Sequence, residues 1–343
     1  MADSVVRIGI VGAGTWGETH ARIYQAHPAA DPVAVCDQDP ARARLMAEKL
    51  GIGAWYGSYE EMLARAGLDA VAIVTPDFAH ADIAVAAARA GKHLLVEKPL
   101  ATTRDDVRRI VDAVTGAGVR AMVDLHNRFS PPFNAAHQAI ADGELGQVQN
   151  LYMRLNDAKW VATDMLPWAA QSSILWFLGS HSVDTLRWMA GSEVTRVYSV
   201  SRAGLLRSMG VDTVDTYLTT LEFADGTIAQ MENGWINPNA MPCVNDIKFT
   251  ALGSLGQINI DASSHNLIQQ YTDTAVTVPD VLVKGLVFGY PAGFAYQSIR
   301  SFVDCLASGA DFKVSLNDAA RVSLIVLAIM ESAARREPVE VRY

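Results

Sequence analysis

The first third of the chain alternates short apolar runs with longer amphipathic segments. The apolar runs are rich in Val and Ile and too short for helices, so they predict buried strands, at residues 5–11, 33–36, 70–75, 93–96 and 120–123. The amphipathic segments predict helices, at residues 17–26, 40–50, 59–66, 79–90 and 104–117. Because strands that alternate with helices form right-handed βαβ units, residues 1–125 are expected to form a doubly wound α/β domain around a parallel sheet.

From residue 126 to residue 343 the pattern changes to longer, partly alternating strands joined by short turns. These strands are predicted at residues 148–156, 194–201, 213–223, 227–235, 246–252 and 257–260, with helices at 171–190 and 316–334. Ala224-Asp225-Gly226 has the composition of a hairpin turn. We therefore expect a second, α+β domain built on a large, mostly antiparallel open sheet.

Composition and charge narrow the class of protein. Half of the 343 residues are apolar, and the formal net charge of −9 disfavours nucleic acids and anionic membranes as partners. No apolar run reaches membrane-spanning length, and the N-terminus shows no secretory signal pattern, so we expect a cytoplasmic protein. The three cysteines, Cys36, Cys243 and Cys305, lack metal-ligand spacing, so no metal site is expected.

A glycine-rich turn joins the first predicted strand to the first predicted helix. It fits the pattern G-x-G-x-x-G and comprises Gly12, Gly14, Thr15, Trp16 and Gly17. In such a turn the glycines allow the tight bend, the close approach of a pyrophosphate and close helix–strand packing, and the helix N-terminus attracts the phosphates. The turn predicts a dinucleotide-binding domain.

Asp37 ends the second predicted strand, twenty residues beyond Gly17. An acidic residue there accepts hydrogen bonds from a ribose 2′-OH and repels a 2′-phosphate, which favours NAD over NADP. The alternative for Asp37 is a turn or helix-capping role before Asp39-Pro40.

Two further segments follow strands of the first domain. Thr75-Pro76 and His80 end the strand predicted at residues 70–75 and enter a helix, where they are either cofactor neighbours or an ordinary helix start. Glu97-Lys98-Pro99 places a charged amine directly after an apolar strand. Because ligands bind at the carboxyl ends of parallel strands, Lys98 is a candidate for chemistry.

With these motifs the chain resembles the Gfo/Idh/MocA family of nicotinamide-dependent oxidoreductases. The resemblance covers essentially the whole chain and includes the stretch Gly179–Asp184, which reads Gly-Ser-His-Ser-Val-Asp. It implies oxidation of a secondary hydroxyl of a sugar or polyol, and a second domain that binds substrate and pairs sheet to sheet in homodimers or homotetramers.

The resemblance also implies roles for individual residues. Lys98 would contact the nicotinamide side and stabilise a developing alkoxide, Glu97 would help to hold the ribose, and His181 would act as general base. The alternative for His181 is a helical histidine satisfied by its neighbours.

One position departs from the family pattern. Relatives commonly carry an Asp four residues before the histidine, where this chain has Phe177. Either Lys98 and His181 suffice, or a carboxylate from elsewhere assists, or the protein binds NAD without ordinary turnover. The candidate carboxylates are Asp184, which shares a helix face with His181, and Asp157 and Asp164.

Substrate contacts are expected from the second domain. Relatives often carry a His-x-Asn pair on its first strand, and here Asn156 matches while Arg154 departs. Arg154 suits a carboxylate, a phosphate or a polyol, or it pairs with Asp157. The remaining candidates are Trp168, whose alternative is plain packing, Asn245, whose alternative is turn chemistry, and Asn127, which follows the first domain.

The sequence therefore predicts an NAD-dependent dehydrogenase of a sugar, a polyol such as an inositol, or a sugar acid. Two other hypotheses stay open. One is a non-catalytic NAD-binding sensor on the same scaffold, which Phe177 favours. The other is an NAD-dependent glycosidase, which oxidises its substrate transiently before an elimination.

Overall fold

The chain forms two compact units, described here from a computed structural model over residues 5–263 and 267–343. The first unit comprises the chain through His126 together with Lys284–Ala320, and the second comprises Asn127–Val283 and Arg321–Tyr343. The sequence had assigned all of 126–343 to one domain, so Lys284–Ala320 is the difference.

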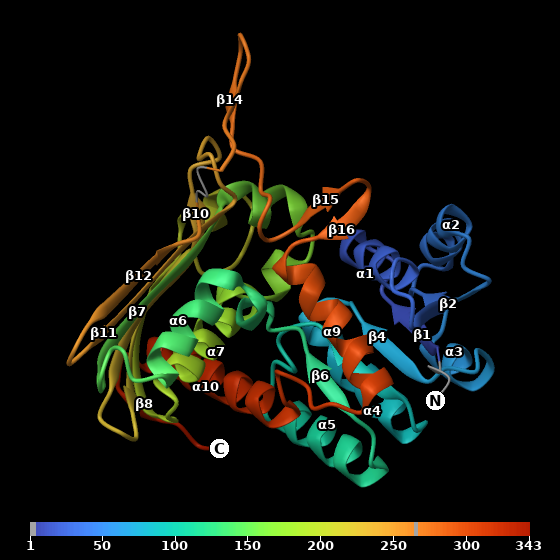
Figure 1. Cartoon of the computed structure of the whole chain (residues 1–343), viewed down its shortest axis with the longest axis horizontal. Helices are drawn as coiled ribbons and strands as arrows, with labels where there is room; N and C mark the ends of the chain where they lie inside the picture. Colours follow the sequence, from blue (N-terminus) through green and yellow to red (C-terminus); the bar gives the residue numbers. More distant parts are fainter. Residues whose placement is uncertain (1–4, 264–266) are drawn as a thin grey trace. The chain divides into compact units, whose positions relative to one another are not determined.

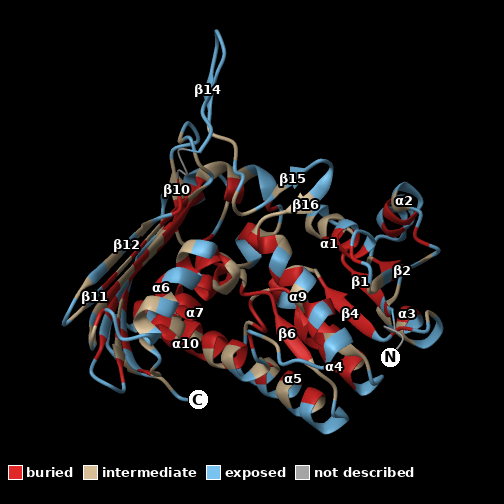
Figure 2. Cartoon of the chain, in the orientation of Figure 1, coloured by how far each residue is buried: buried red, intermediate tan, exposed pale blue. Residues whose placement is uncertain are grey.

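The first unit contains a six-stranded parallel sheet in the order β3-β2-β1-β4-β5-β6. The strands β1, β4, β5 and β6 are almost entirely buried, which explains their apolar sequences, whereas β2 is partly buried and the edge strand β3 has no buried residue (Figure 2). This confirms the predicted doubly wound α/β domain. The strands are β1 (Val6–Val11), β2 (Ala30–Cys36), β3 (Ala54–Tyr56), β4 (Ala70–Ile73), β5 (His93–Val96) and β6 (Ala121–Val123).

Helices connect these strands and begin and end where local chemistry dictates (Figure 1). They are α1 (Thr15–Gln25), α2 (Pro40–Leu50), α3 (Tyr59–Arg65), α4 (His80–Arg89) and α5 (Arg104–Ala117). The side chains of Asp39, Ser58 and Thr103 each accept a backbone N–H at a helix start. Gly51 and Gly118 end α2 and α5 in the left-handed conformation, at φ of 68° and 64°.

The returning segment Lys284–Ala320 joins the first unit through helix α9 (Phe294–Ser308). The apolar face of α9 is buried, with Ile299 and Phe302 fully enclosed, and α9 contacts α1 and β1. A short hairpin of β15 (Gly285–Val287) and β16 (Tyr290–Ala292) precedes it. The amphipathic pattern of α9 shows that it has a core face but does not say against which core the face packs.

The second unit is built on a seven-stranded sheet in the order β12-β11-β7-β10-β9-β8-β17. Only β7 and β10 pair in parallel, so the predicted mostly antiparallel sheet is confirmed. The predicted hairpin turn joins β9 to β10, with Gly226 at φ +90°. The strands are β7 (Val148–Ala158), β8 (Val194–Arg202), β9 (Thr216–Phe223), β10 (Ile228–Asn237), β11 (Asn245–Gly253), β12 (Gln257–Asp261) and β17 (Val339–Glu340).

Helices cover one face of this sheet. They are α6 (Pro131–Ala141), α7 (Ser180–Ala190) and the part of α10 (Leu316–Arg335) that lies in the second unit (Figure 1). The predicted continuous helix over 171–190 is broken into a 3₁₀ turn at Ala169–Gln171, a π-helical turn at Leu175–Gly179, and α7. The remaining elements are α8 (Leu205–Ser208) and a hairpin of β13 (Gln270–Tyr271) and β14 (Val276–Thr277).

None of the helices in the described part of the chain combines the length and the apolarity needed to cross a lipid bilayer.

If α9 completes the core of the first unit, then Phe302→Ala destabilises the protein by about 3–5 kcal/mol, because it leaves a cavity in a fully buried site. Guanidinium unfolding followed by circular dichroism measures this loss. Tyr271→Ala, at a 68 % exposed position, is the matched control and changes the unfolding free energy by less than about 0.5 kcal/mol. An effect of Phe302→Ala as small as that of the control would contradict the assignment.

Candidate active site

The glycine-rich turn between β1 and α1 has the geometry that its sequence predicts. Gly12 has φ +110°, and a Cβ there would lie 2.4 Å from the Val74 carbonyl oxygen. A Cβ on Gly17 would lie 1.9 Å from the carbonyl oxygen of Gly12. Both positions therefore exclude any side chain, because backbone atoms would have to move.

Gly14 differs from these two glycines, because a Cβ there would meet no described atom within 4 Å. Gly14 and Thr15 are exposed at the start of α1, and no side chain caps this helix end. The hydroxyl Oγ1 of Thr75, which follows the neighbouring strand β4, is buried without a hydrogen-bond partner. An open helix N-terminus beside an unsatisfied hydroxyl fits the pyrophosphate of a dinucleotide.

Asp37 lies half-buried after β2, and its carboxylate faces the glycine-rich turn. Its Oδ2 accepts the Ala13 backbone N–H at 2.8 Å, and its Oδ1 accepts the N–H of Asp39 at 2.9 Å. Asp39 itself caps α2, through a bond from the N–H of Ala41 at 3.0 Å. The helix-capping alternative for Asp37 therefore belongs to Asp39, whereas its turn alternative is observed, because Asp37 Oδ1 accepts the N–H of Asp39; its Oδ2 still lies beside the glycine-rich turn.

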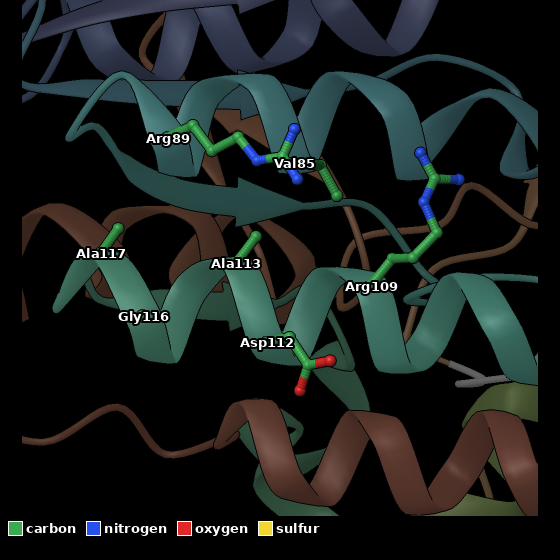
Figure 3. Close-up of a pocket in the computed structure, with 7 residues that line it drawn as sticks. All are labelled: Val85, Arg89, Arg109, Asp112, Ala113, Gly116 and Ala117. Carbon is green, nitrogen blue, oxygen red and sulfur yellow. The ribbon is translucent and has the colours of Figure 1, made fainter.

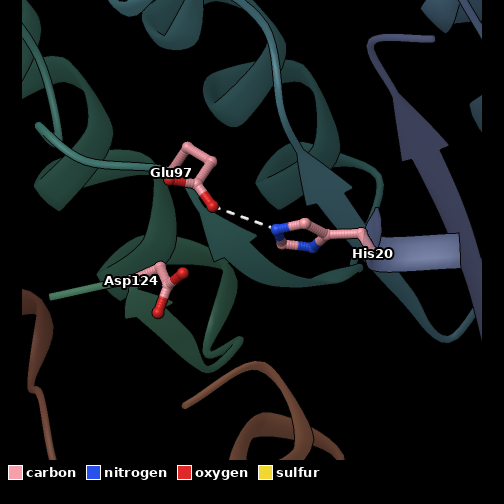
Figure 4. A group of neighbouring side chains, drawn as sticks. All are labelled: His20, Glu97 and Asp124. Atoms are coloured by element: carbon pink, nitrogen blue, oxygen red, sulfur yellow. Dashed lines mark hydrogen bonds and ion pairs between the residues drawn. The ribbon is translucent and has the colours of Figure 1, made fainter. Parts of the chain in front are cut away.

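Glu97, at the end of β5, is 7 % exposed and is held by α1. Its Oε1 accepts the indole N–H of Trp16 at 2.6 Å and lies 3.0 Å from Nε2 of His20 (Figure 4). Burial raises the pKa of Glu97, but the hydrogen bond and charge of His20, the charge of Lys98 and the bond from Trp16 outweigh burial and lower this pKa. Glu97 is thus an ionised anchor.

These contacts occupy polar atoms of two residues that were expected at the cofactor, since Glu97 Oε1 and Trp16 Nε1 bind each other. The ribose contact of Glu97 and the cofactor contact of Trp16 stay predictions. His20, which belongs to no recognised motif, lies on the buried face of α1 with Gly17. A histidine on the inner face of a helix is the signal that could have found it.

Lys98 follows this anchor and is partly exposed. The next residue, Pro99, has its carbonyl oxygen 2.8 Å from Nδ1 of His80, whose Nε2 lies 3.0 Å from the carbonyl oxygen of Thr75. His80 is fully buried, and this burial lowers its pKa against the effect of the two carbonyls. His80 therefore joins the segments after β4 and β5 rather than facing a cofactor, and Thr75 and Pro76 lie on the joined segment.

In the second unit, His181 lies in the first turn of α7 and is 3 % exposed. Two residues of the second unit fix this turn. Thr185 Oγ1 donates to the His181 carbonyl oxygen at 2.8 Å and accepts the side-chain N–H of Asn127 at 3.1 Å. Asn127 was expected to contact substrate, but its amide nitrogen supports the helix that carries His181.

Asp184 forms a buried ion pair in the same unit. Arg128 Nε and Nη2 donate to its two oxygens at 3.0 and 2.6 Å, and Asp184 is fully buried. The Arg128 guanidinium also lies 5.9 Å from the ring centroid of Trp188. Both carboxylate oxygens of Asp184 are therefore committed to Arg128, which gives Asp184 a structural role rather than the expected catalytic one.

Phe177 lies in the π-helical turn directly before α7. Its ring packs edge-on against the ring of Trp168, with 6.3 Å between the two ring centroids. π-helical turns within helices occur often at functional sites. Of the two other candidate carboxylates, Asp164 is exposed, whereas Asp157 is 1 % exposed and accepts a hydrogen bond from the amide of Asn245.

Arg154 and Asn156 lie on the sheet face opposite α7. Asn233 of β10 donates to Ser182 of α7 at 3.0 Å, so its neighbour Glu232 points to the other face. Asn156 donates to that Glu232 at 2.6 Å, and Arg154 Nε lies 2.9 Å from Asp246. The structure therefore does not bring these two expected substrate residues to the face that α7 and His181 occupy, and Arg154 pairs with Asp246 rather than Asp157.

A surface pocket of about 510 Å³ lies between α4 and α5 (Figure 3). Its lining includes Arg89 and Gly116, near the helix ends that precede β5 and β6. These helix ends adjoin the amino ends of the strands, whereas Lys98 follows a carboxyl end. The pocket is therefore separate from the candidate active site.

We expect Gly14→Ala to fold normally but to weaken NAD binding by about 10-fold or more, because the methyl group would occupy space that only a bound pyrophosphate needs. Isothermal titration calorimetry measures the affinity and thermal unfolding the stability. Gly53→Ala, at another position with open space, is the control. Unchanged NAD affinity in Gly14→Ala would rule out this placement of the phosphates.

We expect Arg128→Gln to destabilise the protein by about 3–5 kcal/mol, because it leaves the Asp184 carboxylate buried without its cation. Arg207→Gln, which removes an exposed pair with Asp212, costs less than about 1 kcal/mol. Equilibrium unfolding compares the two variants. Equal effects would show that the Arg128–Asp184 pair has no special structural weight.

Comparison with known proteins identifies the family. Residues 6–125 match the family model described as "Oxidoreductase family, NAD-binding Rossmann fold", and residues 133–259 match the "GFO/IDH/MocA C-terminal domain". The chain is 28 % identical to inositol 2-dehydrogenase of Rhizobium meliloti over 331 residues, covering 96 % of each chain. It is 30 % identical to D-xylose 1-dehydrogenase (NADP⁺) 2 of Haloferax volcanii, covering 97 % of this chain and 98 % of that one.

The fold agrees with solved structures. Scyllo-inositol dehydrogenase from Lactobacillus casei, solved with bound NAD(H) and scyllo-inositol, superposes with a TM-score of 0.84 at 19 % identity, over 98 % of this chain and 99 % of that one. With both family models matched in order along its length, the chain belongs to the GFO/IDH/MocA family of oxidoreductases and carries the family's NAD-binding Rossmann domain.

Proposed function

We propose that this oxidoreductase is an NAD-dependent dehydrogenase that oxidises a secondary hydroxyl of a sugar, an inositol-like polyol or a sugar acid. Family membership and relatives named as inositol and xylose dehydrogenases support the reaction class. The observation that carries the proposal is Lys98. It follows β5 between two fixed points, the buried Glu97 anchor and the Pro99–His80 contact.

In this proposal each basic residue has one task. Lys98, a cation at the carboxyl end of the sheet, stabilises the alkoxide that forms when the substrate hydroxyl loses its proton. His181 accepts that proton, since an imidazole has a pKa near neutral pH. NAD, when bound, supplies the hydride acceptor.

Asp157, Asn245 and Trp168 are the proposed substrate contacts of the second unit. By strand alternation, Asp157 and its register partner Asn245 share the sheet face that packs against α7. Trp168 is partly exposed beside Phe177, and an aromatic face suits the C–H face of a sugar ring. Arg154 and Asn156 are not retained as contacts.

We propose NAD rather than NADP as the working cofactor. The Asp37 carboxylate lies beside the glycine-rich turn, where an acidic side chain disfavours a ribose 2′-phosphate. One relative at 30 % identity is named for NADP⁺, so measuring the affinities of this protein for NAD and for NADP tests the proposed cofactor.

A second candidate function is an NAD-binding sensor without turnover. Phe177 favours it, because its ring packs on Trp168 where relatives commonly place a carboxylate. Turnover by the wild-type protein decides between the two functions.

We also propose that the protein is cytoplasmic and forms a homodimer or homotetramer through the second sheet. Support for the interface comes from large apolar side chains exposed at alternate positions of neighbouring strands, namely Tyr198, Val200, Leu218, Ile228 and Leu252.

Wild-type protein should produce NADH with at least one member of a panel of inositols, aldoses and sugar acids. Lys98→Met should lower kcat/KM by about 10²–10³-fold, because it removes the charge that stabilises the alkoxide and keeps the side-chain length. NAD affinity should fall far less than kcat/KM, because Lys98 is only one of several expected cofactor contacts, and Lys49→Met, which loses an exposed pair with Glu18, should resemble wild type. Full activity of Lys98→Met would refute its role, and tight NAD binding without turnover on the whole panel would favour the sensor.

A further inference from the structure

Three titratable side chains meet in the interior of the first unit, where Asp124, which has no role above, joins the Glu97 anchor and His20. His20 of α1 and Asp124, which follows β6, are fully buried, and Glu97 is 7 % exposed. One polar atom from each lies within 4.8 Å of the others (Figure 4). Two carboxyl groups thus share a site closed to solvent.

The two carboxyl groups have unequal surroundings. Glu97 Oε1 accepts the indole N–H of Trp16 and contacts Nε2 of His20, and the next residue, Lys98, is a cation. Neither oxygen of Asp124 has a hydrogen-bond partner within the described residues. The hydroxyl of Ser298, on the buried face of α9, is also without one.

The other groups that face Asp124 do not balance a second negative charge. His126, two residues further on, has its Nδ1 3.7 Å from Asp124 Oδ2. Tyr24 of α1 has its hydroxyl 3.2 Å from Nδ1 of His20. Lys98 adjoins Glu97. An ionised Asp124 would have a single histidine, His126 at 3.7 Å, as its nearest possible cation and no hydrogen-bond donor within bonding distance among the described residues, so its charge would be poorly compensated in a buried site.

Two close carboxyl groups in such a site do not both ionise, and the proton goes to the one with fewer donors. Burial first, and then the charge of Glu97, raise the pKa of Asp124, against weaker opposing effects of His126 and Ser298. The pKa of Glu97 moves in the opposite direction. The environments thus separate one neutral acid from one anion.

We propose that Asp124 is a neutral carboxylic acid in the working protein and a positioning residue for Lys98. Because Asp124 is protonated, Glu97 is the one carboxylate of this site that carries a negative charge. Trp16 and His20 therefore keep their contacts with Glu97, and the position of the next residue, Lys98, is fixed. An ionised Asp124 would compete for those donors. The positioning role rests on the proposed function, whereas the protonation state does not.

The proposal fixes the sign of a pH dependence. When a carboxyl group has a higher pKa in the folded than in the unfolded protein, the free energy of unfolding falls as the pH rises from the unfolded-state pKa to the folded-state pKa. Across that window the unfolding equilibrium of wild type should shift toward unfolding by about 10-fold per pH unit relative to Asp124→Asn, which cannot ionise.

The test combines spectroscopy, unfolding and kinetics on the full-length protein. Infrared difference spectra near neutral pH should show the carbonyl band of one protonated carboxyl group that is absent from Asp124→Asn and present in the control Asp82→Asn, at an exposed position. Asp124→Asn, an isostere of the neutral acid, should keep wild-type KM and kcat near neutral pH and lose less activity than wild type in alkali. Glu97→Gln, which removes the neighbouring charge but not the burial, should shift the loss of this band to lower pH than in the wild type.

Two results would overturn the proposal. One is a wild-type spectrum without the protonated band. The other is a stoichiometric divalent metal in the purified protein that Asp124→Asn releases, since one imidazole and two carboxylates are also a ligand set for such ions. Should the band be present while no substrate is turned over, the proposed dehydrogenase function fails and the protonation of Asp124 stands.

Discussion

The contact on which the first unit depends is the convergence of two ring nitrogens on one oxygen of Glu97. Trp16, the fifth position of the glycine-rich motif, and His20 both lie on α1, while Glu97 directly follows β5. The bond therefore ties the phosphate-binding end of α1 to the residue that precedes Lys98. Because the carboxylate is buried, replacing either ring removes one of the two contacts that stabilise its charge, so the turn and the lysine are fixed together.

The second unit uses the same device around His181. Asp184, three residues along α7, is fully buried and bound by both arms of the Arg128 guanidinium. In each unit a basic residue proposed to act on the substrate lies close in sequence to a carboxylate that is committed to holding the backbone. These carboxylates therefore fix the positions of neighbouring residues. Lys98 is left as the group proposed to stabilise the alkoxide, and His181 as the group proposed to accept the proton.

The elements of the first unit follow from its sequence because their signals are local. Buried parallel strands are apolar without alternation, and residues such as Asp39 and Gly51 mark helix ends within one turn of chain. Strand β3 is not predicted from the sequence, because a strand of three residues is too short to show a hydrophobic period. Helix α9 was unassigned, and its packing on the first unit escaped too, because amphipathicity says that a face is buried and not against which core.

The candidate site was predictable at the level of motifs but less so at the level of contacts. The glycines of the turn fit because their constraint is backbone sterics, which the spacing encodes. Asp184 and Asn156 were misplaced because a family pattern gives residue positions along an element, whereas Arg128 and Glu232, their partners, come from other elements. His80 and Trp16 also stand in the sequence where ligand contacts are expected, but their hydrogen-bond partners in the fold, which the motifs do not give, come from other segments of the chain.

The central claim is that hydride leaves a secondary carbon of a polyhydroxylated substrate for the nicotinamide ring. The most direct measurement supplies the protein with NAD and a panel of inositols, aldoses and sugar acids deuterated at their carbinol carbons, and examines the reduced cofactor by mass spectrometry and NMR. The account predicts NADH that carries one deuterium at nicotinamide C4. Reduced cofactor without deuterium, or no reduction by any member of the panel, would contradict it.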